Sequence, residues 1–384
     1  METIRNGRFV IEKLKSNGHE AYYVGGCVRD HLLGLEIRDI DITTSAKPFE
    51  VLKLFKSEPT GLKYGTITVL HEKVNIEVTT YRVDGTYEDF RKPTEVTLTD
   101  SKEEDVKRRD FTINGLLMDE NYEITDYVGG QEDLQNHIIR AIGNPVERFN
   151  EDALRLLRAV YFQTKLGFQI DKDTRDAMKE NAHLITHLPN ERVLNETLKI
   201  LSGDYQLMGL KTIETTGLSK YLPGLEKGIN FINENLKDRI FIDSFFVLCF
   251  SLHGSVPNNW KFSNVHRNKY QKSVELVLKN SEIDALILYN YGLEISLLAN
   301  KILFILGKQK NQKNQIKTLF EALPINSVTD LKVKGSDILS LTEKKQGAWL
   351  SKLLDELVTK VLKKELVNKH EDLMNYCRGI LNEK

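Results

Sequence analysis

Two glycines, an arginine and two aspartates near the N-terminus have the types and spacing that phosphate and metal chemistry needs. Gly25 and Gly26 leave a strand-like run, where a glycine pair lets the backbone approach a ligand closely. The helix expected next presents its N-terminal N–H groups to phosphate, and the fork of donors on Arg29 can hold a triphosphate. Asp39 and Asp41 stand two apart, so on a strand their carboxylates share a face. This arrangement suits a pair of Mg²⁺ ions bridged by nucleotide phosphates.

Glu77 lies in a later strand-like run and is the candidate for a third carboxylate beside this pair. A solvated surface glutamate is the competing interpretation of the same residue. A glycine turn or an Asp-x-Asp triplet taken alone is usually structural. The order and spacing of the two together predict a catalytic, metal-binding site.

A small mixed α/β region is expected to position these side chains. Runs rich in β-branched or aromatic residues predict strands at Ala21–Val24, Asp39–Thr44, Thr66–His71, Val74–Tyr81 and Ile124–Tyr127. Helices are predicted at Arg29–Leu33, Pro48–Phe55 and around Asp105–Leu116. After Pro145 the pattern becomes long apolar-periodic stretches, the first over residues 146–168, and strand signals almost vanish. The predicted fold class is an α/β head with a mixed sheet, followed by an all-α extension.

The change from strand-like runs to long apolar-periodic stretches predicts three parts of the chain. These are a metal-binding head at 1–140, a helical neck at 141–201, and a helical body and tail at 202–384. Residues 1–140 contain 26 acidic and 19 basic side chains, whereas residues 301–384 contain 10 acidic and 16 basic ones. This asymmetry suits a front that holds metal ions and a back that holds a polyanion. Ordinary solvated surface explains the same numbers equally well.

The three cysteines are far apart and form no CxxC pair, which fits a reducing cytoplasm and argues against a disulfide framework or a zinc site. The N-terminus lacks the apolar core of a signal peptide, and the most apolar stretches are too short to span a membrane. A cytoplasmic protein without a membrane partner is expected.

Five segments, in order, resemble motifs A to E of the class II CCA-adding enzymes and bacterial poly(A) polymerases, in the nucleotidyltransferase superfamily of DNA polymerase beta. The matching segments are Val24–Asp30 with Asp39–Asp41, Arg108–Gly115, Asp126–Leu134, Glu151–Arg155, and Glu191–Glu196. The resemblance covers roughly residues 22–201, and beyond them the chain is similar only in being helical. It implies that motif B contacts the incoming nucleotide, with Arg109 on phosphate and with Asp110 and Asn114 on hydroxyls.

The segment that resembles motif D offers a way to select a base. On one helix, Asp152, Arg155 and Arg158 would follow at i, i+3 and i+6 along one broad face. Cytosine and adenine both present an amino donor beside a ring nitrogen acceptor, whereas uracil and guanine present a carbonyl beside an N–H. A carboxylate acceptor with a guanidinium donor therefore matches C and A, and Arg158 is a candidate phosphate contact. An ordinary i, i+3 salt bridge is the alternative interpretation.

Tyr161 stands where relatives commonly have arginine, so no nucleotide contact is transferred to it. Ala153 stands where bacterial poly(A) polymerases usually have proline, which favours synthesis of the tRNA end. The segment 84–93 resembles the flexible loop that lets such enzymes switch from C to A, and relatives that add only C lack this loop. The chain contains no His-Asp dipeptide, so the phosphohydrolase domain of some relatives is expected to be absent.

The resemblance implies template-independent addition and repair of the tRNA 3′-terminal CCA from CTP and ATP, with two Mg²⁺ ions as the cofactor. The tRNA 3′-hydroxyl attacks the nucleotide α-phosphate, and the helical extension grips tRNA by shape and backbone. An enzyme that adds only A, a poly(A) polymerase, and a non-catalytic tRNA- or nucleotide-binding relative are the alternatives. A homodimer stays open.

Overall fold

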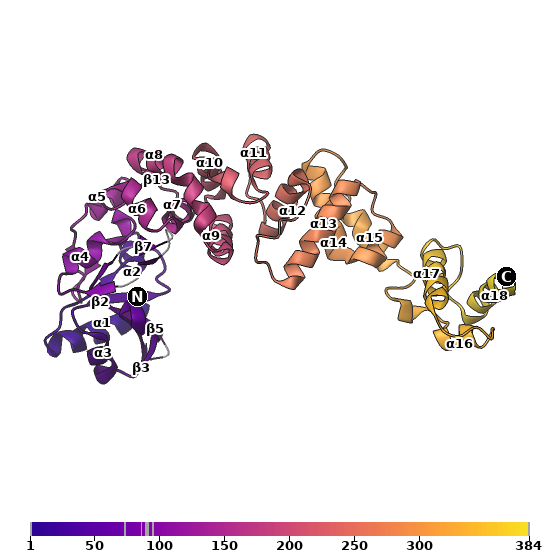
Figure 1. Ribbon diagram of the computed structural model, residues 1–384, viewed down its shortest axis with the longest axis horizontal. Helices are drawn as coiled ribbons and strands as arrows, with labels where there is room; N and C mark the ends of the chain where they lie inside the picture. Colours follow the sequence, from indigo (N-terminus) through magenta and orange to yellow (C-terminus); the bar gives the residue numbers. More distant parts are fainter. Residues whose placement is uncertain (1, 73, 86, 89–91, 94–95, 383–384) are drawn as a thin grey trace. The chain divides into compact units, whose positions relative to one another are not determined.

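The computed structural model describes residues 2–382 apart from 73, 86, 89–91 and 94–95. The chain forms two compact units (Figure 1). Unit 1 consists of Met1–Arg239 with Asn259–Lys261, and unit 2 consists of Ile240–Asn258 with Phe262–Lys384. All strands of the described residues lie in unit 1, and unit 2 is helical there. The predicted α/β head and all-α extension are confirmed.

A seven-stranded mixed sheet organises the N-terminal part of unit 1. Its strand order is β11-β10-β1-β2-β5-β4-β3. The strands are β1 (Ala21–Val24), β2 (Ile40–Thr44), β3 (Ser57–Gly61), β4 (Thr66–His71), β5 (Val74–Thr80), β10 (Leu117–Met118) and β11 (Ile124–Thr125). β2 pairs antiparallel with β1 and parallel with β5, and this register places Asp41 beside Glu77.

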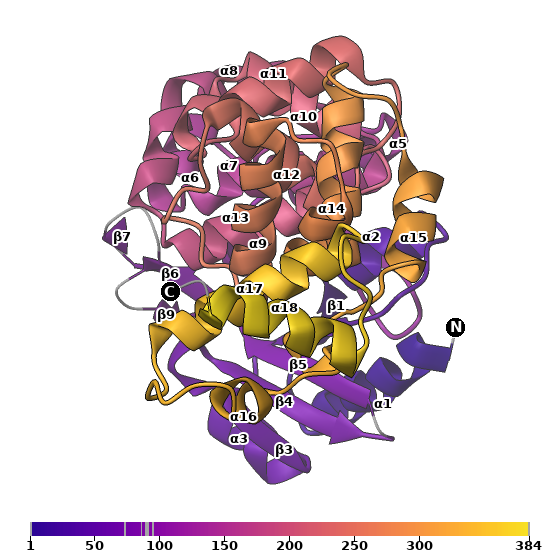
Figure 2. The same ribbon diagram turned by 90° about the vertical axis from the view of Figure 1, so that its right-hand side faces the viewer.

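Helices α1 (Glu2–Ser16) and α3 (Pro48–Leu54) pack on the strands of this sheet (Figure 2). Val10, Ile11 and Leu14 of α1 are fully buried, as an i, i+1, i+4 apolar stripe requires. The short helix α2 (Gly26–Leu32) follows β1 directly. The sheet and its helices thereby fix the glycine turn at the end of β1 and the carboxylates on β2 and β5.

The helix predicted at 105–116 is wrong in its position. Helix α4 spans Lys102–Lys107, because Ser101 caps it by accepting the Glu104 N–H. The chain then becomes extended: the Thr112 N–H donates to the Arg140 carbonyl, and the Ile142 N–H donates to the Asp110 carbonyl. A single 3₁₀ turn, η2 (Thr112–Asn114), follows. Pairing with a distant segment ends this helix, which local periodicity does not reveal.

The long periodic stretch predicted over residues 146–168 is two helices, α6 (Pro145–Glu151) and α7 (Leu154–Leu166). Asp152 lies between them with φ −134° and ψ 101°, outside the helical region. Its Oδ1 accepts the Leu154 N–H at 3.0 Å, which satisfies a backbone donor at the start of α7. The expectation that Asp152, Arg155 and Arg158 share one helix is therefore wrong for Asp152.

The remaining elements of unit 1 are smaller strands and the helices of its C-terminal half. The strands are β6 (Arg82–Asp84), β7 (Tyr87–Glu88), β8 (Lys92–Pro93), β9 (Val96–Leu98), β12 (Ile138–Ile139) and β13 (Gln169–Ile170). The helices are α5 (Gly130–Gln135), α8 (Lys172–Asn181), η3 (Ala182–His187), α9 (Asn190–Ser202), α10 (Gln206–Thr215), η4 (Leu218–Tyr221) and α11 (Glu226–Asn235), with η1 (Leu62–Tyr64) in the head. Of the predicted switch loop, residues 86 and 89–91 lie outside the described residues.

Unit 2 contains α12 (Ile242–His253), α13 (Asn264–Lys279), α14 (Ala285–Ile305), α15 (Lys313–Glu321), η5 (Val328–Asp330), α16 (Gly335–Leu339), α17 (Ala348–Leu362) and α18 (His370–Asn382). An aromatic cluster that includes Phe246, Phe250, Phe262 and Tyr270 packs between α12 and α13. No helix in the described part of the chain is both long and apolar enough to cross a membrane.

Trp260, one of the three residues that return to unit 1, is buried and donates its indole N–H to the Pro223 carbonyl.

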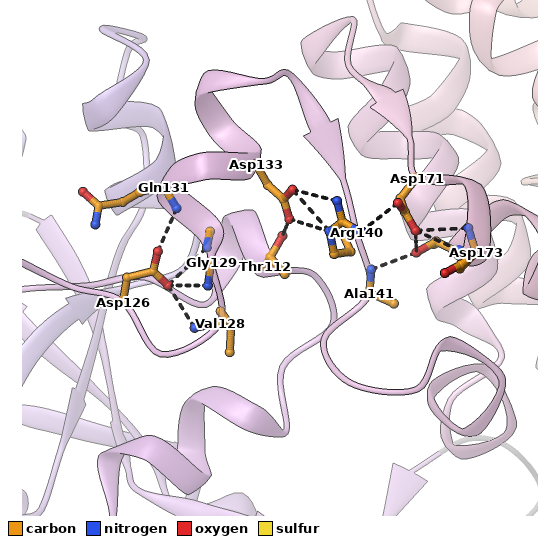
Figure 3. A network of polar contacts seen from close by, with 12 residues as sticks. Thr112, Asp126, Val128, Gly129, Gln131, Asp133, Arg140, Ala141, Asp171 and Asp173 are labelled. Carbon is orange, nitrogen blue, oxygen red and sulfur yellow. Dashed lines mark hydrogen bonds and ion pairs between the residues drawn. The ribbon is translucent and has the colours of Figure 1, made fainter.

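A polar network fixes the turn η2 against helix α5 (Figure 3). The Asp126 carboxylate accepts four successive backbone N–H groups at the start of α5, from residues 128–131. Asp133 of α5 accepts the Thr112 hydroxyl at 2.7 Å and pairs with Arg140, which also reaches Asp171. The segment that resembles motif C thus supports the segment that resembles motif B.

Replacing Gly130 with alanine is expected to destabilise this junction strongly. An added Cβ would lie 2.2 Å from the Thr112 carbonyl oxygen, so backbone must move, at a cost of about 1–3 kcal/mol or more. Gly129→Ala is the matched control, because its added Cβ meets no atom within 4 Å and only its positive φ of 77° is strained, at about 1 kcal/mol. Urea unfolding midpoints measure both, and equal midpoints would contradict the close packing.

Candidate active site

Three carboxylates lie near one another where β2 and β5 run side by side. Asp41 on β2 and Glu77 on β5 are direct register partners, and Asp39 immediately precedes β2. Burial raises the pKa of Asp41 to about 6, and the negative charges of Glu77 and Asp39 act in the same direction while Arg109 opposes them. The predicted grouping of Asp39 and Asp41 with Glu77 at one place agrees with this electrostatic coupling. Asp39 itself lies just outside the strand.

The glycine turn lies against this carboxylate group. Gly25 has φ 75°, which a residue with a side chain adopts only with strain. A Cβ added there would lie 3.6 Å from Asp41 Oδ2 and 3.8 Å from Arg109 Nη1. Gly25, the metal-binding carboxylate candidate and the phosphate-binding arginine candidate are therefore immediate neighbours. The missing side chain leaves room for a ligand between them.

Asp110, Asn114, Arg29 and Arg158 form one buried polar network. Asp110 Oδ2 accepts Arg158 Nε at 2.8 Å and Nη2 at 2.6 Å, and its Oδ1 accepts the Asn114 amide. Burial alone would raise the pKa of Asp110, but Arg158 and Asn114 lower it to about 2, so the carboxylate stays ionised. Arg29 is 3 % exposed and donates to Asp30 and to the Asn114 oxygen. These partners hold the Arg29 guanidinium in place in the cleft lining, with N–H donors left over for a ligand.

The base-selecting candidates have separate partners in this structure. Arg155 is 6 % exposed, and its Nη1 donates to Glu151 at 2.7 Å while its Nη2 donates to the Arg108 carbonyl at 3.0 Å. Asp152 lies 3.7 Å from Arg192 Nη2. Burial raises the pKa of Asp152, and Arg192 is the foremost charge that opposes this rise. Arg155 is therefore held by Glu151 of motif D, whereas Asp152 lies near Arg192 of motif E.

All of these residues line one open cleft of about 1510 Å³ in unit 1. The twelve predicted site residues that line it are Gly25, Gly26, Arg29, Asp39, Asp41, Glu77, Arg109, Asp110, Asn114, Asp152, Arg155 and Arg158. They are separated by up to 133 positions in the sequence, from 25 to 158. The structure thus brings the entire predicted set together around a single space.

The cleft also contains residues to which the sequence assigned no role in the site. Arg192 and Lys165 add cations, and Tyr161 faces the same space with the Lys199 ammonium 5.6 Å from its ring centre. Arg192 lies in the segment that resembles motif E, and its positive charge there could have indicated a contact with the nucleotide. Lys165 follows Arg158 by seven residues, two helical turns, and so shares its face of α7.

The donor set suits Mg²⁺ bound partly by substrate. Among the described residues, no group of three or more His, Cys, Asp or Glu side chains is arranged to hold one metal ion. Mg²⁺ usually binds one or two carboxylates together with water and nucleotide phosphate oxygens, and Asp39 with Asp41 provides that number. Besides burial, the negative charges of Glu77 and Asp39 raise the pKa of Asp41, and a divalent cation would neutralise this negative charge.

Comparison with known proteins gives consistent matches along the chain. A family model for the Poly A polymerase head domain matches residues 21–140, and one for tRNA nucleotidyltransferase domain 2 matches residues 242–377. The CCA-adding enzyme of Bacillus cytotoxicus is 39% identical over 98% of this chain and 98% of its own length, and that of Bacillus mycoides is 37% identical over 98% and 99%.

The chain belongs to the CCA-adding enzyme family. The crystal structure of the Bacillus stearothermophilus CCA-adding enzyme in complex with CTP matches all of this chain and 98% of its own, with a TM-score of 0.84 and 32% identity. Membership of this family confirms the resemblance that motifs A to E indicated. The roles of individual cleft residues stay predictions from chemistry and position.

Replacing Asp41 with asparagine is expected to stabilise the metal-free protein. The folded-state pKa of about 6 exceeds the usual 3.8, so ionised Asp41 opposes folding above pH 6 and this penalty fades as pH falls below it. In EDTA at pH 7.5, the free energy of unfolding should rise by about 1–3 kcal/mol, and the difference should shrink toward zero at pH 4. Urea unfolding at both pH values checks this, and a less stable variant at pH 7.5 would contradict it.

Proposed function

We propose that this chain adds and repairs the 3′-terminal CCA of tRNA, with CTP and ATP as substrates and without a nucleic-acid template. The observation that supports this most directly is the single cleft that all twelve predicted residues line. Family membership over nearly the full length supports the same activity. The tRNA substrate places the protein in the cytoplasm.

We assign the chemistry to the carboxylate end of the cleft. Asp39 and Asp41 hold two Mg²⁺ ions, with Glu77 as the neighbouring carboxylate. When bound, the metal ions lower the pKa of the attacking 3′-hydroxyl and neutralise charge on the leaving phosphates. Arg109 binds phosphate oxygens beside the Gly25–Gly26 turn, because its Nη1 lies next to Gly25. The 3′-hydroxyl attacks the α-phosphate, and pyrophosphate leaves.

We assign nucleotide recognition to the network on the other side of the cleft. Asp110 and Asn114 bind ribose hydroxyls, and Arg158 holds Asp110 ionised so that it acts as an acceptor. Asp152 accepts the amino group of cytosine or adenine, and Arg155 donates to the neighbouring ring nitrogen. Because Asp152 lies in the break between α6 and α7 whereas Arg155 lies on α7, a small rearrangement at the break changes their spacing. That freedom suits a pocket that accepts first C and then A.

Addition of A alone and poly(A) synthesis are the alternatives within the family, and a non-catalytic tRNA- or nucleotide-binding relative is the alternative outside catalysis. Incubation with labelled CTP, labelled ATP or both, and with tRNA ending before, within or after CCA, separates them. Incorporation of two C residues and one A defines the proposed activity. ATP-only incorporation, long A tracts, or no incorporation each select one alternative.

Asp39→Ala and Asp41→Ala are each expected to lower the rate of CTP addition by more than about a hundredfold. Losing a metal ligand removes several kcal/mol of transition-state stabilisation, while both variants keep the fold. Asp176→Ala is the matched control, because Asp176 is an exposed aspartate on α8 outside the cleft. Rates come from single-turnover assays with tRNA that lacks CCA. Activity within tenfold of the wild type would contradict the metal-ligand assignment.

Arg155→Ala and Asp152→Ala are expected to relax the choice of base more than they reduce overall turnover. Each well-aligned base contact contributes roughly 1–3 kcal/mol of discrimination, so selectivity should fall about tenfold to a hundredfold. The measurement is the ratio of kcat/KM for CTP to that for UTP, with Arg175→Ala on α8 as the exposed-arginine control. An unchanged ratio with a general loss of activity would mean that the pair supports the helices and does not select the base.

A further inference from the structure

Asp105 on α4 is a fully buried carboxylate that the proposed function does not use. Five donor groups converge on it. Its Oδ1 accepts Arg108 Nε at 2.9 Å, Arg108 Nη2 at 2.8 Å and the Arg82 backbone N–H at 3.4 Å. Its Oδ2 accepts the Thr43 hydroxyl at 3.0 Å and Arg109 Nη2 at 3.0 Å. The carboxylate lies behind the cleft and is not among the residues that line it.

Stability alone explains this group poorly. Burial of the carboxylate would raise its pKa, but Arg109 and Arg108 lower the pKa to about 2, so Asp105 is a buried negative charge at every working pH. Buried ion pairs often stabilise a fold no better than apolar residues of similar volume, because desolvation offsets their attraction. Asp105 binds two arginines of the motif B segment, Arg108 and Arg109, so the positions in which it holds these arginines are a better explanation for its presence.

The explanation lies in what each end of the Arg109 guanidinium faces. Nη2 is bound to Asp105, whereas Nη1 is the atom near Gly25, on the side of Asp41. Asp41 is a half-buried carboxylate, and the positive charge of Arg109 opposes the rise in its pKa that burial causes, so Asp41 attracts the same guanidinium. Without a competing carboxylate, Arg109 would pair directly with Asp41 and occupy the position needed for phosphate and metal.

Thr43 makes the arrangement geometrically tight. It follows Asp41 by two residues on β2, so both side chains emerge on the same face of the strand. Its hydroxyl donates to the same oxygen of Asp105 that accepts Arg109 Nη2. The strand that carries Asp41 and the arginine are thus fastened to one atom, which fixes the separation between them.

We propose that Asp105 is a positioning residue for nucleotide transfer: it holds Arg109 away from direct pairing with Asp41 and aims Nη1 at the phosphate oxygens of the incoming nucleotide. This inference rests on the proposed function, because it takes phosphate binding by Arg109 as its starting point. Asp105 itself touches neither nucleotide nor metal.

A double-mutant cycle of Asp105→Asn with Arg109→Ala tests it. The asparagine keeps the shape of the side chain and loses its charge. In EDTA, where only protein groups bind CTP, Asp105→Asn should raise the dissociation constant for CTP about tenfold or more. Arg109→Ala should raise it at least as much, and the double variant should match Arg109→Ala within about twofold, because the effect of Asp105 passes through Arg109. A double variant whose loss is the product of the two single losses would overturn the proposal, as would unchanged CTP affinity in Asp105→Asn.

The Mg²⁺ requirement gives a second readout that a merely structural role would not move. In Asp105→Asn, Arg109 competes with the metal for Asp41, so the Mg²⁺ concentration for half-maximal rate should rise severalfold. In the double variant it should return to the value of Arg109→Ala. An equal requirement in all four proteins would overturn the proposed competition.

Asp133→Asn is the matched control, since Asp133 is also a buried aspartate that accepts a threonine hydroxyl and pairs with an arginine, outside the cleft lining. Its effect on CTP binding should be additive with Arg109→Ala, and a non-additive result there would remove the support for Asp105. If Asp105→Asn does not fold, Asp105→Glu keeps the charge, displaces the carboxylate and enters the same cycle. Failure of the wild type to add CCA would refute the proposed function alone, because CTP binding in EDTA is measured without turnover.

Discussion

The parallel pairing of β2 with β5 is the constraint on which the site depends. It sets Asp41, which is half-buried, directly beside Glu77, which is exposed, so that their like charges repel each other. The surrounding structure answers that accumulation of negative charge. Arg109 supplies a positive charge, Gly25 leaves space for a cation and a triphosphate, and Asp105 shares the arginine so that it does not cancel the carboxylate outright. The repulsion among these carboxylates is the same property that makes the site receptive to a metal-bound nucleotide.

The helical half of unit 1 contributes a second constraint, the interruption between α6 and α7. Asp152 breaks the helix and satisfies a backbone donor of the next one, so its carboxylate is tied to a joint in the chain, whereas Arg155 is anchored inside α7 and by Glu151. Arg192 from α9 lies beside the carboxylate of Asp152. Three segments therefore determine the distance between one acceptor and one donor, and a displacement of any of them alters the edge that the pair can match.

Local sequence patterns predicted well what depends on local rules. The strands that carry Asp41 and Glu77 and the glycine turn before α2 follow from residue type and spacing, and both aspartates of the Asp-x-Asp triplet line the cleft. The predicted helix boundaries are wrong where contacts with distant segments of the chain determine the backbone conformation. The extended backbone at Phe111 exists because Phe111 pairs with the distant Ala141. Periodicity over 146–168 conceals the break at Asp152 because both helices bury the same kind of residue. The half-buried Glu151 and the buried Asp105 look like surface charges in the sequence, since burial is a property of the assembled fold.

Trp260 shows that the catalytic unit is not a continuous stretch of sequence. The chain leaves this unit after Arg239, forms α12, and returns for three residues so that the indole fills the interior beside Pro223. Recombination between relatives at residue 239 would separate that tryptophan from the hollow it occupies and pair each half with a foreign counterpart. A functional exchange of the helical C-terminal part must therefore keep Trp260 together with its own N-terminal unit. The two units are for this reason expected to evolve together, even where they perform separate tasks.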